Sequence, residues 1–406
     1  MHRVATSYSR VCAMSGFSLK KSLSAAAVML LGCLFFTRLV FPAKIFDKAA
    51  KKQLTTYLYD ICEWIMAREQ ASHDGQIRSV AGDPFSLQGN LARVLIAGSE
   101  LTKNGSRFLE EALRWCDRFA SQQQRVVTSQ GKEGGYWPSA QAGTVALAEN
   151  SFAAAALARA CEYADAGRRK NYRQVLERYA LFLLEGTQLP GHSSQTGWII
   201  TQGDDAGALG TGTEKAAALA KPSTASTAGG ASFFAQLYAV SRNRQHRDQA
   251  LKSLEWLLKN RRPNGEVINF TDGKESDAAA FTAVTLFAEA VQSASYLLED
   301  ASFNERLGTD LENTVRQMMR IQAENGLWGE GPDRRGSSGV ATLLAWYYLS
   351  FKADETIPQS LDKFWQNLSN PVHAQSFGVL LHPISTAWMG LTTAEMIKPG
   401  ITFKKQ

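Results

Sequence analysis

The chain has 406 residues, of which 45% are hydrophobic, and its 44 Lys and Arg residues outnumber 38 Asp and Glu residues, giving a formal net charge of +6. This length supports a sizeable core, which a single repeat-built domain could use in full. The basic residues are scattered without interleaved aromatic side chains, so no nucleic-acid partner is expected. The five cysteines form no Cys-x-x-Cys pair, which excludes a disulfide scaffold and a cysteine-rich zinc site and predicts buried free thiols.

An apolar run occupies residues 22–42, interrupted by Arg38 and preceded by two lysines. Its length suits a signal anchor that spans the membrane or the hydrophobic part of a cleaved signal peptide. We expect residues 1–21 to be cytoplasmic and the rest of the chain to be extracytoplasmic (periplasmic, luminal or extracellular), or secreted if the signal is cleaved. Leu30 to Cys33 also resembles a bacterial lipobox, which would attach a lipid to Cys33.

Helical periodicity begins at residue 46 and continues almost to the end of the chain. The segment 46–70 is amphipathic, and the next helix starts at Asp83-Pro84, an N-cap followed by proline, and runs to residue 101. Asn104-Gly105-Ser106 then turns the chain into a returning helix with Phe108 and Cys116 on its apolar face. The later helices alternate between alanine-rich outgoing segments and more polar returning ones. We expect these pairs at 144–163 and 171–184, 223–240 and 248–258, 277–298 and 303–321, and 339–351 and 358–368, followed by a last helix at 383–396.

Each returning helix is followed by a glycine and an aromatic or aliphatic pair. The glycines that mark the repeat are Gly75, Gly135, Gly197, Gly265 and Gly326, spaced 60, 62, 68 and 61 residues apart. Such glycines close helices in the left-handed conformation. A period of this length predicts a repeat architecture. With the first helix closing against the last, we expect an all-α (α/α)6 toroid over residues 46–398, after an N-terminal membrane helix.

Gly-Leu-Trp at residues 326–328, then a polar loop and Ser-Ser-Gly opening an apolar helix, resembles the last repeats of the six-hairpin glycosidase superfamily. Within it, the unsaturated glucuronyl and rhamnogalacturonyl hydrolases are the nearest comparison. The resemblance implies an inner and an outer ring of six helices. It also implies a carbohydrate-active enzyme, although the same toroid hosts hydrolases, lyases and epimerases.

In such a ring the loops before the inner helices meet at one end, and residues there are candidates for chemistry. The predicted catalytic residues are Glu149, Asp204, Asp205 and Asp277. The predicted substrate-binding residues are Trp137, Asn150, Trp198, Trp328, Arg334, Arg335 and His382.

Glycoside hydrolysis needs one carboxylic acid and one carboxylate base. Glu149-Asn150 resembles the segment that bears the catalytic Asp of the glucuronyl hydrolases, with Glu-Asn in place of Asp-Asn or Asp-Asp. Glu149 could otherwise be an ordinary helix residue. Asp204 and Asp205 lie in a long glycine-rich loop and could hold a water, sugar hydroxyls or a cation, or form a surface turn. Asp277 could be catalytic or a helix cap.

Tryptophans after the repeat glycine could stack on sugar rings or fill the space between hairpins. Arg334 and Arg335 could hold the carboxylate of a uronic acid or pair with Asp333. His382 could reach the site or be structural. No P-loop, Gly-x-Ser-x-Gly or His-Glu-x-x-His motif is present, and we expect no cofactor and no resident metal.

The predicted function is a glycoside hydrolase acting on an acidic poly- or oligosaccharide. A non-catalytic glycan-binding or assembly subunit of envelope polysaccharide biosynthesis remains an alternative. A polysaccharide lyase is a third possibility, with His382 or Tyr136 as base and Arg335 as neutraliser. The oligomeric state is left open.

Overall fold

The structure is a computed structural model that describes residues 46–73, 85–103, 105–138, 145–187, 197–212, 221–278, 280–351, 354–369 and 383–404. The segments 1–21 and 22–42, and with them the predicted membrane helix, lie outside the described residues. None of the helices within the described ranges combines the length and hydrophobicity that a membrane span requires.

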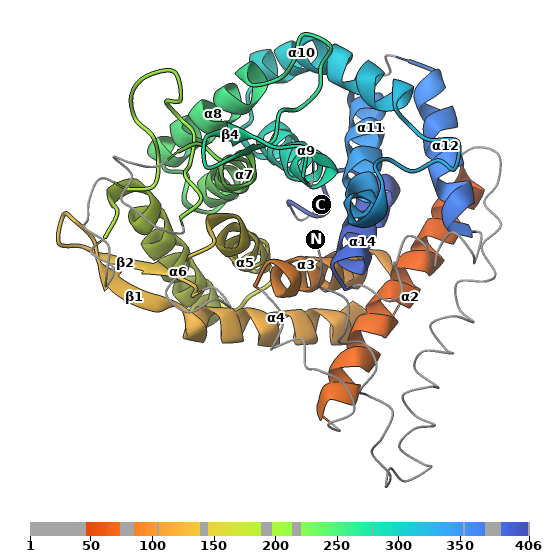
Figure 1. The fold of residues 1–406 in the computed structure, drawn as a ribbon. Helices are drawn as coiled ribbons and strands as arrows, with labels where there is room; N and C mark the ends of the chain where they lie inside the picture. The colour runs from red at the N-terminus through yellow and green to blue at the C-terminus, as the bar shows by residue number, and fades with distance from the viewer. Residues whose placement is uncertain are drawn as a thin grey trace, which may run out of the picture.

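Twelve α-helices within these ranges form two concentric rings (Figure 1). The inner ring consists of α3 (Phe85–Leu101), α5 (Leu147–Ala160), α7 (Thr224–Ser241), α9 (Ala280–Leu297), α11 (Ser337–Phe351) and α14 (Pro383–Ile397). The outer ring consists of α2 (Lys48–His73), α4 (Gly105–Gln122), α6 (Ala166–Glu185), α8 (Arg244–Lys259), α10 (Ala301–Arg320) and α12 (Thr356–Ser369). The predicted (α/α)6 toroid is therefore confirmed.

Helices of the two rings differ in how much of their surface is buried. In α4 the buried residues, among them Phe108, Trp115 and Phe119, recur at helical spacing on one face, as expected of a helix with one side in water. In α7 nearly every residue from Thr224 to Leu237 is buried, because the helix is covered on all sides. Small residues let the inner helices approach closely: a Cβ added at Gly339 of α11 would lie 2.2 Å from the Thr285 hydroxyl of α9.

The ring closes without a gap. Each inner helix packs against the next, and α14 packs against both α3 and α2, as predicted for the last and first helices. The free cysteines Cys62 and Cys116 are buried, as expected, and their thiols face the carbonyls of Val94 and Ala156 on inner helices. These contacts join the outer ring to the inner one.

Two short antiparallel hairpins add strands to the expected all-α fold. β1 (Gln124–Val127) pairs with β2 (Glu133–Tyr136) between α4 and α5, and β3 (Phe270–Thr271) pairs with β4 (Lys274–Glu275) between α8 and α9. A 3-10 helix, η3 (Gly331–Gly336), precedes α11.

The repeat glycines are left-handed in the later repeats, as predicted, but they do not close the preceding helices, because α8 ends at Lys259 and α10 at Arg320. Gly265 and Gly326 have φ of 89° and 80°, and a Cβ on either would lie within 2.4 Å of the backbone of the next outer helix. The third repeat uses Gly207 for this role, with φ of 96° and a Cβ position 2.5 Å from the Lys252 carbonyl oxygen. Assigning Gly197 to that place is therefore wrong. Gly135 lies in β2 rather than in a left-handed helix end, and Gly75 lies outside the described residues.

The chain after α14 turns into the ring at the end where the inner helices finish (Figure 1). The Glu395 carboxylate accepts hydrogen bonds from the N–H groups of Gly400 and Thr402 at 2.7 and 2.8 Å. The Arg159 guanidinium of α5 donates to the Ile401 carbonyl, and Lys404 donates to the Tyr296 carbonyl of α9. Residues 398–404 thus fill this end of the ring, here named the closed end. The opposite end, where the inner helices begin, is named the mouth.

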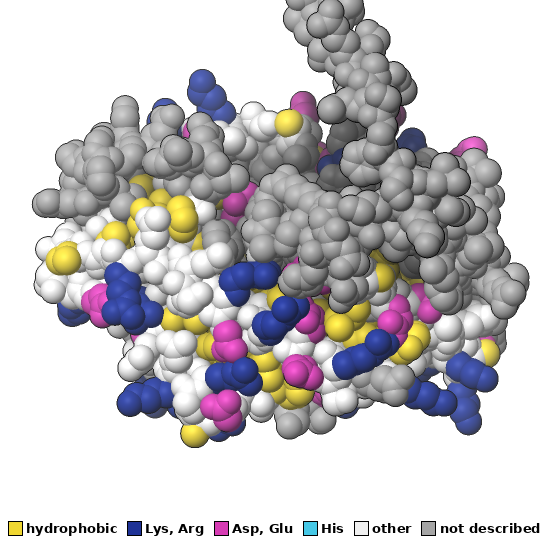
Figure 2. All heavy atoms as spheres, turned by 90° about the horizontal axis from the view of Figure 1, so that it is seen from below, with side chains coloured by type: hydrophobic (Ala, Val, Ile, Leu, Met, Phe, Trp, Pro, Cys, Tyr) yellow, Lys and Arg dark blue, Asp and Glu magenta, His cyan; other side chains and the backbone are white. Residues whose placement is uncertain are grey.

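Charged side chains of both signs cover the outer surface. Figure 2 shows the face seen from below, where α4 lies in Figure 1, with Lys and Arg side chains interspersed among Asp and Glu. Several are paired, as in Arg114 with Glu111. Exposed pairs of this kind contribute little to stability.

Candidate functional site at the mouth of the ring

Six connections lead from outer to inner helices at the mouth. Five of them include residues outside the described ranges, and η3 before α11 belongs to the sixth. The described part of the mouth therefore consists mainly of the first turns of the inner helices, η3, and the approach to α9.

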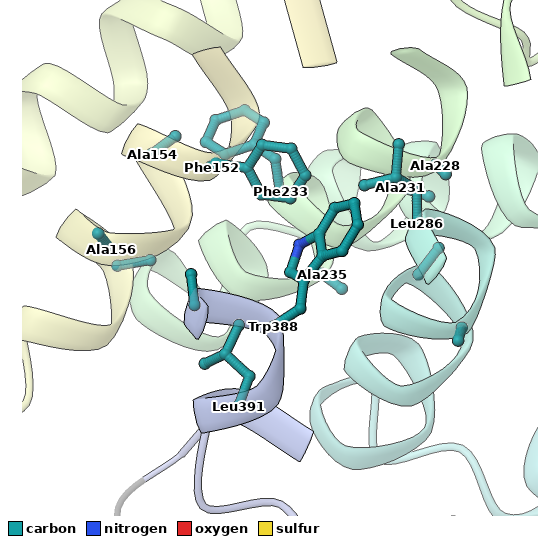
Figure 3. Packing of buried hydrophobic residues seen from close by; sticks show 14 of the residues in the cluster. Phe152, Ala154, Ala156, Ala228, Ala231, Phe233, Ala235, Leu286, Trp388 and Leu391 are labelled. Carbon is teal, nitrogen blue, oxygen red and sulfur yellow. The ribbon is translucent and has the colours of Figure 1, made fainter. Parts of the chain in front are cut away.

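Glu149 occupies the first turn of α5, on the side that faces the ring interior. Residues three and seven positions further along a helix share its face, and these are Phe152 and Ala156. Figure 3 shows Phe152 of α5 and Trp388 of α14 turned toward the interior. Glu149 is half-buried, and no hydrogen bond or ion pair joins it to another described residue. Removal from water raises the pKa of its carboxyl.

Asn150, predicted to bind substrate, instead clamps the backbone of Trp137. Its Oδ1 accepts from the Trp137 N–H at 2.7 Å, and its Nδ2 donates to the Trp137 carbonyl at 2.9 Å. Both residues are buried, and the Trp137 indole donates to the Phe119 carbonyl of α4. Neither side chain is available to a sugar, so their assignment to substrate binding is corrected.

The same clamp recurs at Trp328. The Ser337 hydroxyl accepts from the Trp328 N–H and donates to the Trp328 carbonyl, both at 2.9 Å. The indole is 0% exposed and donates to the Met318 carbonyl of α10. Trp328 therefore fills the space between hairpins and offers no face to a substrate.

Trp198 does not occupy the equivalent place. In that repeat the Thr227 hydroxyl of α7 accepts from the Leu209 N–H at 2.9 Å, two residues after Gly207. Trp198 is buried against Phe182 of α6, with ring centroids 5.9 Å apart. It is thus also a packing residue, and the expected row of three sugar-stacking indoles is absent from the described mouth.

Asp204 and Asp205 lie against the outer helix α8, away from the inner ring. The Asp204 carboxylate is fully exposed, 3.7 Å from the Lys259 ammonium. The Asp205 carboxylate accepts from the indole N–H of Trp256. Because α8 belongs to the outer ring, these acids are not placed opposite Glu149, which corrects their assignment as its partners.

The capping role considered for Asp277 belongs to Asp333. Both Asp333 carboxylate oxygens accept from the Phe281 N–H, at 3.1 and 3.3 Å, at the start of α9. Burial raises the Asp333 pKa, and the hydrogen bonds from α9 oppose this shift. Asp277 is exposed beside the mouth, with no hydrogen bond to another described residue.

Arg334 and Arg335 lie in η3, half-buried at the start of α11. The Arg334 guanidinium donates to the Gly329 carbonyl, whereas no described residue bonds the Arg335 guanidinium. Neither pairs with Asp333. In the order of the ring α11 stands opposite α5, so η3 and Glu149 are on opposite sides of the mouth (Figure 1). His382 lies outside the described residues.

Trp388 and an internal ion pair were not foreseen from the sequence. Trp388 of α14 keeps 8% of its surface exposed, and no described residue accepts a hydrogen bond from its indole. Beneath it, Arg93 of α3 reaches across the ring to Glu289 of α9, at 2.6 Å. Together they border a cavity of about 40 Å³. A lone charge in an apolar inner helix, as in Ala-Arg-Val and Ala-Glu-Ala, was the signal that could have found the pair.

No group of three or more His, Cys, Asp or Glu side chains within the described ranges is arranged to hold a metal ion.

No protein-family model matches the sequence, and the search of curated proteins found no match. Solved structures do match. The GH76 α-mannanase of Bacteroides thetaiotaomicron aligns with a TM-score of 0.54 at 12% identity, over 83% of this chain and 95% of its own. A polysaccharide lyase aligns with a TM-score of 0.54 at 10% identity, over 86% of this chain and 100% of its own.

A third match is an α-1,6-mannanase of Salegentibacter sp. HEL1_6, an inactive variant with two aspartates replaced by asparagine, in complex with α-1,6-mannotriose. It aligns with a TM-score of 0.52 at 12% identity, over 84% of this chain and 98% of its own. The fold of this chain is therefore similar to that of these three proteins, as the resemblance noted in the sequence implies. At these identities the likeness concerns the fold alone.

Proposed function

We propose that the protein is a carbohydrate-active enzyme that hydrolyses a glycan at the mouth of the ring, with Glu149 as general acid. The proposal is carried by the position of Glu149, a half-buried carboxyl on the interior face of α5 to which no described residue is hydrogen-bonded or ion-paired. Its raised pKa favours the protonated form that a general acid needs. The folds of the mannanases and the lyase are consistent with this use of the toroid.

In this reaction Glu149 donates its proton to the glycosidic oxygen as the bond from that oxygen to the anomeric carbon breaks. A water molecule adds to the anomeric carbon and gives its proton to a base. Asp277 is the described carboxylate proposed for that role, because Asp333 is committed to the N-terminus of α9. The guanidinium of Arg335, on the opposite side of the mouth and bonded by no described residue, supports an acidic sugar as substrate. The apolar segment 22–42 would place the reaction outside the cytoplasm, attached to the membrane or secreted.

The test compares Glu149→Gln with Asp204→Asn/Asp205→Asn on uronic acid oligosaccharides and α-1,6-linked mannooligosaccharides. We expect Glu149→Gln to lower kcat by a factor on the order of 10² to 10⁴, the usual contribution of a general acid. The double variant should keep its activity, because these acids lie on the outer ring. Equal activity of Glu149→Gln and wild type would refute the assignment. Ultraviolet absorbance of the products would identify an unsaturated sugar and hence a lyase.

A non-catalytic glycan-binding function is the second candidate. It is favoured by the outward positions of Asp204 and Asp205, because these acids then do not face Glu149. In that case the wild type binds oligosaccharide without turnover, and Glu149→Gln changes affinity alone.

A further inference from the structure

A groove on the outside of the ring is lined by residues of the outer helix α6 and of the β1–β2 hairpin. These two elements lie side by side (Figure 1). The groove has a volume of about 650 Å³, within the range of sites that hold ligands. It is lined by Arg125, Glu133, Ala166, Arg169, Lys170, Arg173, Gln174, Glu177, Arg178 and Leu181. Arg169 and Arg173 also border a second hollow of about 330 Å³ that extends to Phe403 at the closed end. The two hollows therefore share a wall of arginine side chains.

Positive charge dominates this groove, with five cations against two acids. One of the acids, Glu133, is already paired with Arg125 at 3.1 Å. The other, Glu177, lies 3.6 Å from the His246 ring of α8. The two carboxylates in the groove therefore neutralise less than half of the charge of its five cations.

The remaining four cations all belong to α6, and none pairs with a carboxylate of the described residues. Arg169 donates to the carbonyls of Cys161 and Ala164. Arg178 donates to the amide oxygen of Gln123. For Lys170 and Arg173 the described residues provide no hydrogen-bond or ion-pair partner.

Neighbouring α4 shows the opposite pattern. Its Arg114 pairs with Glu111, and its Asp117 pairs with Arg168 from the other flank of α6. The cationic groove is therefore a local departure from the paired surface seen elsewhere on the outer ring.

The cations of the groove are close enough to disfavour one another. Burial, and secondly the charge of Arg125, lower the pKa of Arg178, and the charge of Glu133 opposes this shift in part. An anion seated between these two side chains would relieve this repulsion. Guanidinium groups bind carboxylates and sulfates through two parallel hydrogen bonds, so an arginine-rich wall suits groups of that shape.

We propose that this groove is a second glycan site, outside the ring, that binds a polysaccharide chain carrying carboxylate or sulfate groups. The choice of a glycan rests on the proposed function, whereas the choice of a polyanion rests on the groove itself. Among the described residues that line the groove, none is an aromatic residue that could stack on nucleic-acid bases. The groove is concave, and the apolar residues that line it are Ala166 and Leu181. Such a surface does not suit insertion into a membrane.

The test measures binding of the full chain to polygalacturonate by isothermal titration calorimetry, with fully methyl-esterified polygalacturonate as the uncharged control. The variant Lys170→Glu/Arg173→Glu reverses two charges in the groove. The matched control, Lys52→Glu/Lys363→Glu, makes the same change of net charge on α2 and α12, across the ring, at exposed positions. Circular dichroism verifies that both variants fold.

We expect the groove variant to raise Kd for polygalacturonate at least tenfold and the control to change it less than twofold. Added salt should weaken the wild-type interaction, and the esterified polymer should not bind. Equal losses in both variants, or no loss in either, would overturn the proposal. So would stronger binding to anionic phospholipid vesicles or single-stranded DNA that Lys170→Glu/Arg173→Glu abolishes, since the partner would then be a membrane or a nucleic acid.

Glu149→Gln separates this proposal from the proposed function. If the mouth is inactive but the groove is correct, wild type and Glu149→Gln bind polygalacturonate equally and neither cleaves it. If only the proposal for the groove is wrong, cleavage of short oligosaccharides still depends on Glu149, whereas Lys170→Glu/Arg173→Glu leaves the Kd for polygalacturonate unchanged.

Discussion

Asn150 holds Trp137 by both polar groups of its backbone, accepting from the N–H at 2.7 Å and donating to the carbonyl at 2.9 Å. A side chain at the start of the inner helix thereby fixes the strand-like segment that leads into it. Ser337 does the same for Trp328. The clamp explains why these indoles turn toward the outer helices and away from the mouth.

Replacing Asn150 by Asp should test the clamp. A carboxylate can accept from the Trp137 N–H but cannot donate to its carbonyl, and it would be charged in a buried place. We expect a loss of about 3 kcal/mol in the free energy of unfolding, measured by guanidinium denaturation. Ser337→Ala should cost about 2 kcal/mol, because it leaves two buried backbone groups of Trp328 unpaired. An unchanged denaturation midpoint in Asn150→Asp would show that the clamp is not a stabilising contact.

The glycine at the turn of each repeat allows a second test. Gly326 combines a φ of 80° with a Cβ position 2.4 Å from the Lys363 carbonyl oxygen, whereas Gly203 has a φ of 78° and nothing within 4 Å. Gly203→Ala should therefore cost about 1 kcal/mol for the left-handed backbone alone. Gly326→Ala should cost more, about 3 kcal/mol, because α12 must also move. Equal costs in thermal and chemical denaturation would mean that close packing against α12 is unimportant.

The fold was predictable because periodicity and repeat spacing are properties of sequence. Alternating alanine-rich and polar helices specify which helices are covered on all sides, and the glycines mark the turns. The prediction chose the wrong glycine in the third repeat because Gly197 and Gly207 both precede a buried apolar residue. Only contact with the next outer helix distinguishes them, and Gly207 makes it. The acids Asp204 and Asp205 were misplaced for the same reason, since the extra residues between the two glycines carry them outward.

The site was less predictable than the fold. Glu149 could be placed at the mouth because its helical position follows from the pattern of α5. The direction of a tryptophan cannot be read in this way: Gly-Tyr-Trp and Gly-Leu-Trp look alike whether the indole faces a substrate or a neighbouring helix. Trp388 lacks the preceding glycine, so the repeat pattern did not select it.

Because Arg93 and Glu289 form an ion pair inside the ring, replacing one of them should destabilise the fold much more than replacing both. The Arg93 guanidinium is almost fully buried and bonds Glu289 at 2.6 Å. Glu289→Ala leaves that charge unpaired and should cost about 3–5 kcal/mol in unfolding free energy, whereas Arg93→Met/Glu289→Leu should lie within about 1 kcal/mol of wild type. Urea denaturation of both variants gives the comparison. If the double variant is as unstable as the single one, the loss of stability comes from losing the ion pair itself and not from burying Arg93 without a partner.

His246 should make stability depend on pH between about 4 and 6.5. Burial lowers its pKa from 6.5 to about 4. Between these values the unfolded chain binds a proton that the folded chain does not, so stability falls as the pH drops through this window, by up to roughly 3 kcal/mol. Burial raises the pKa of Glu177, so this neighbour offers less negative charge to oppose the effect.

His246→Gln keeps a group that can bond the Ser241 hydroxyl, which lies 3.0 Å from the His246 Nδ1. Between pH 7 and pH 4.5 the unfolding free energy should fall less in this variant than in the wild type. If it falls equally in both proteins, His246 has the same pKa in the folded and the unfolded chain.

Under the proposed function, Trp388 is the candidate tryptophan for contact with a glycan, because its indole faces the interior from α14 (Figure 3). Trp256 of the outer ring, which donates to Asp205, serves as its control. Replacing Trp388 by Phe preserves a ring for stacking and fills much of the same volume, whereas Leu removes the aromatic face. We expect Trp388→Leu to raise KM for oligosaccharides about tenfold, corresponding to about 1.4 kcal/mol of lost stacking, with a smaller change in kcat. Trp388→Phe should remain within about threefold of wild type, and Trp256→Phe should have no effect on KM. If Trp388→Leu is folded and its KM is unchanged, the glycan does not enter the ring at this point, and Glu149 would have to act without an aromatic floor beneath the sugar.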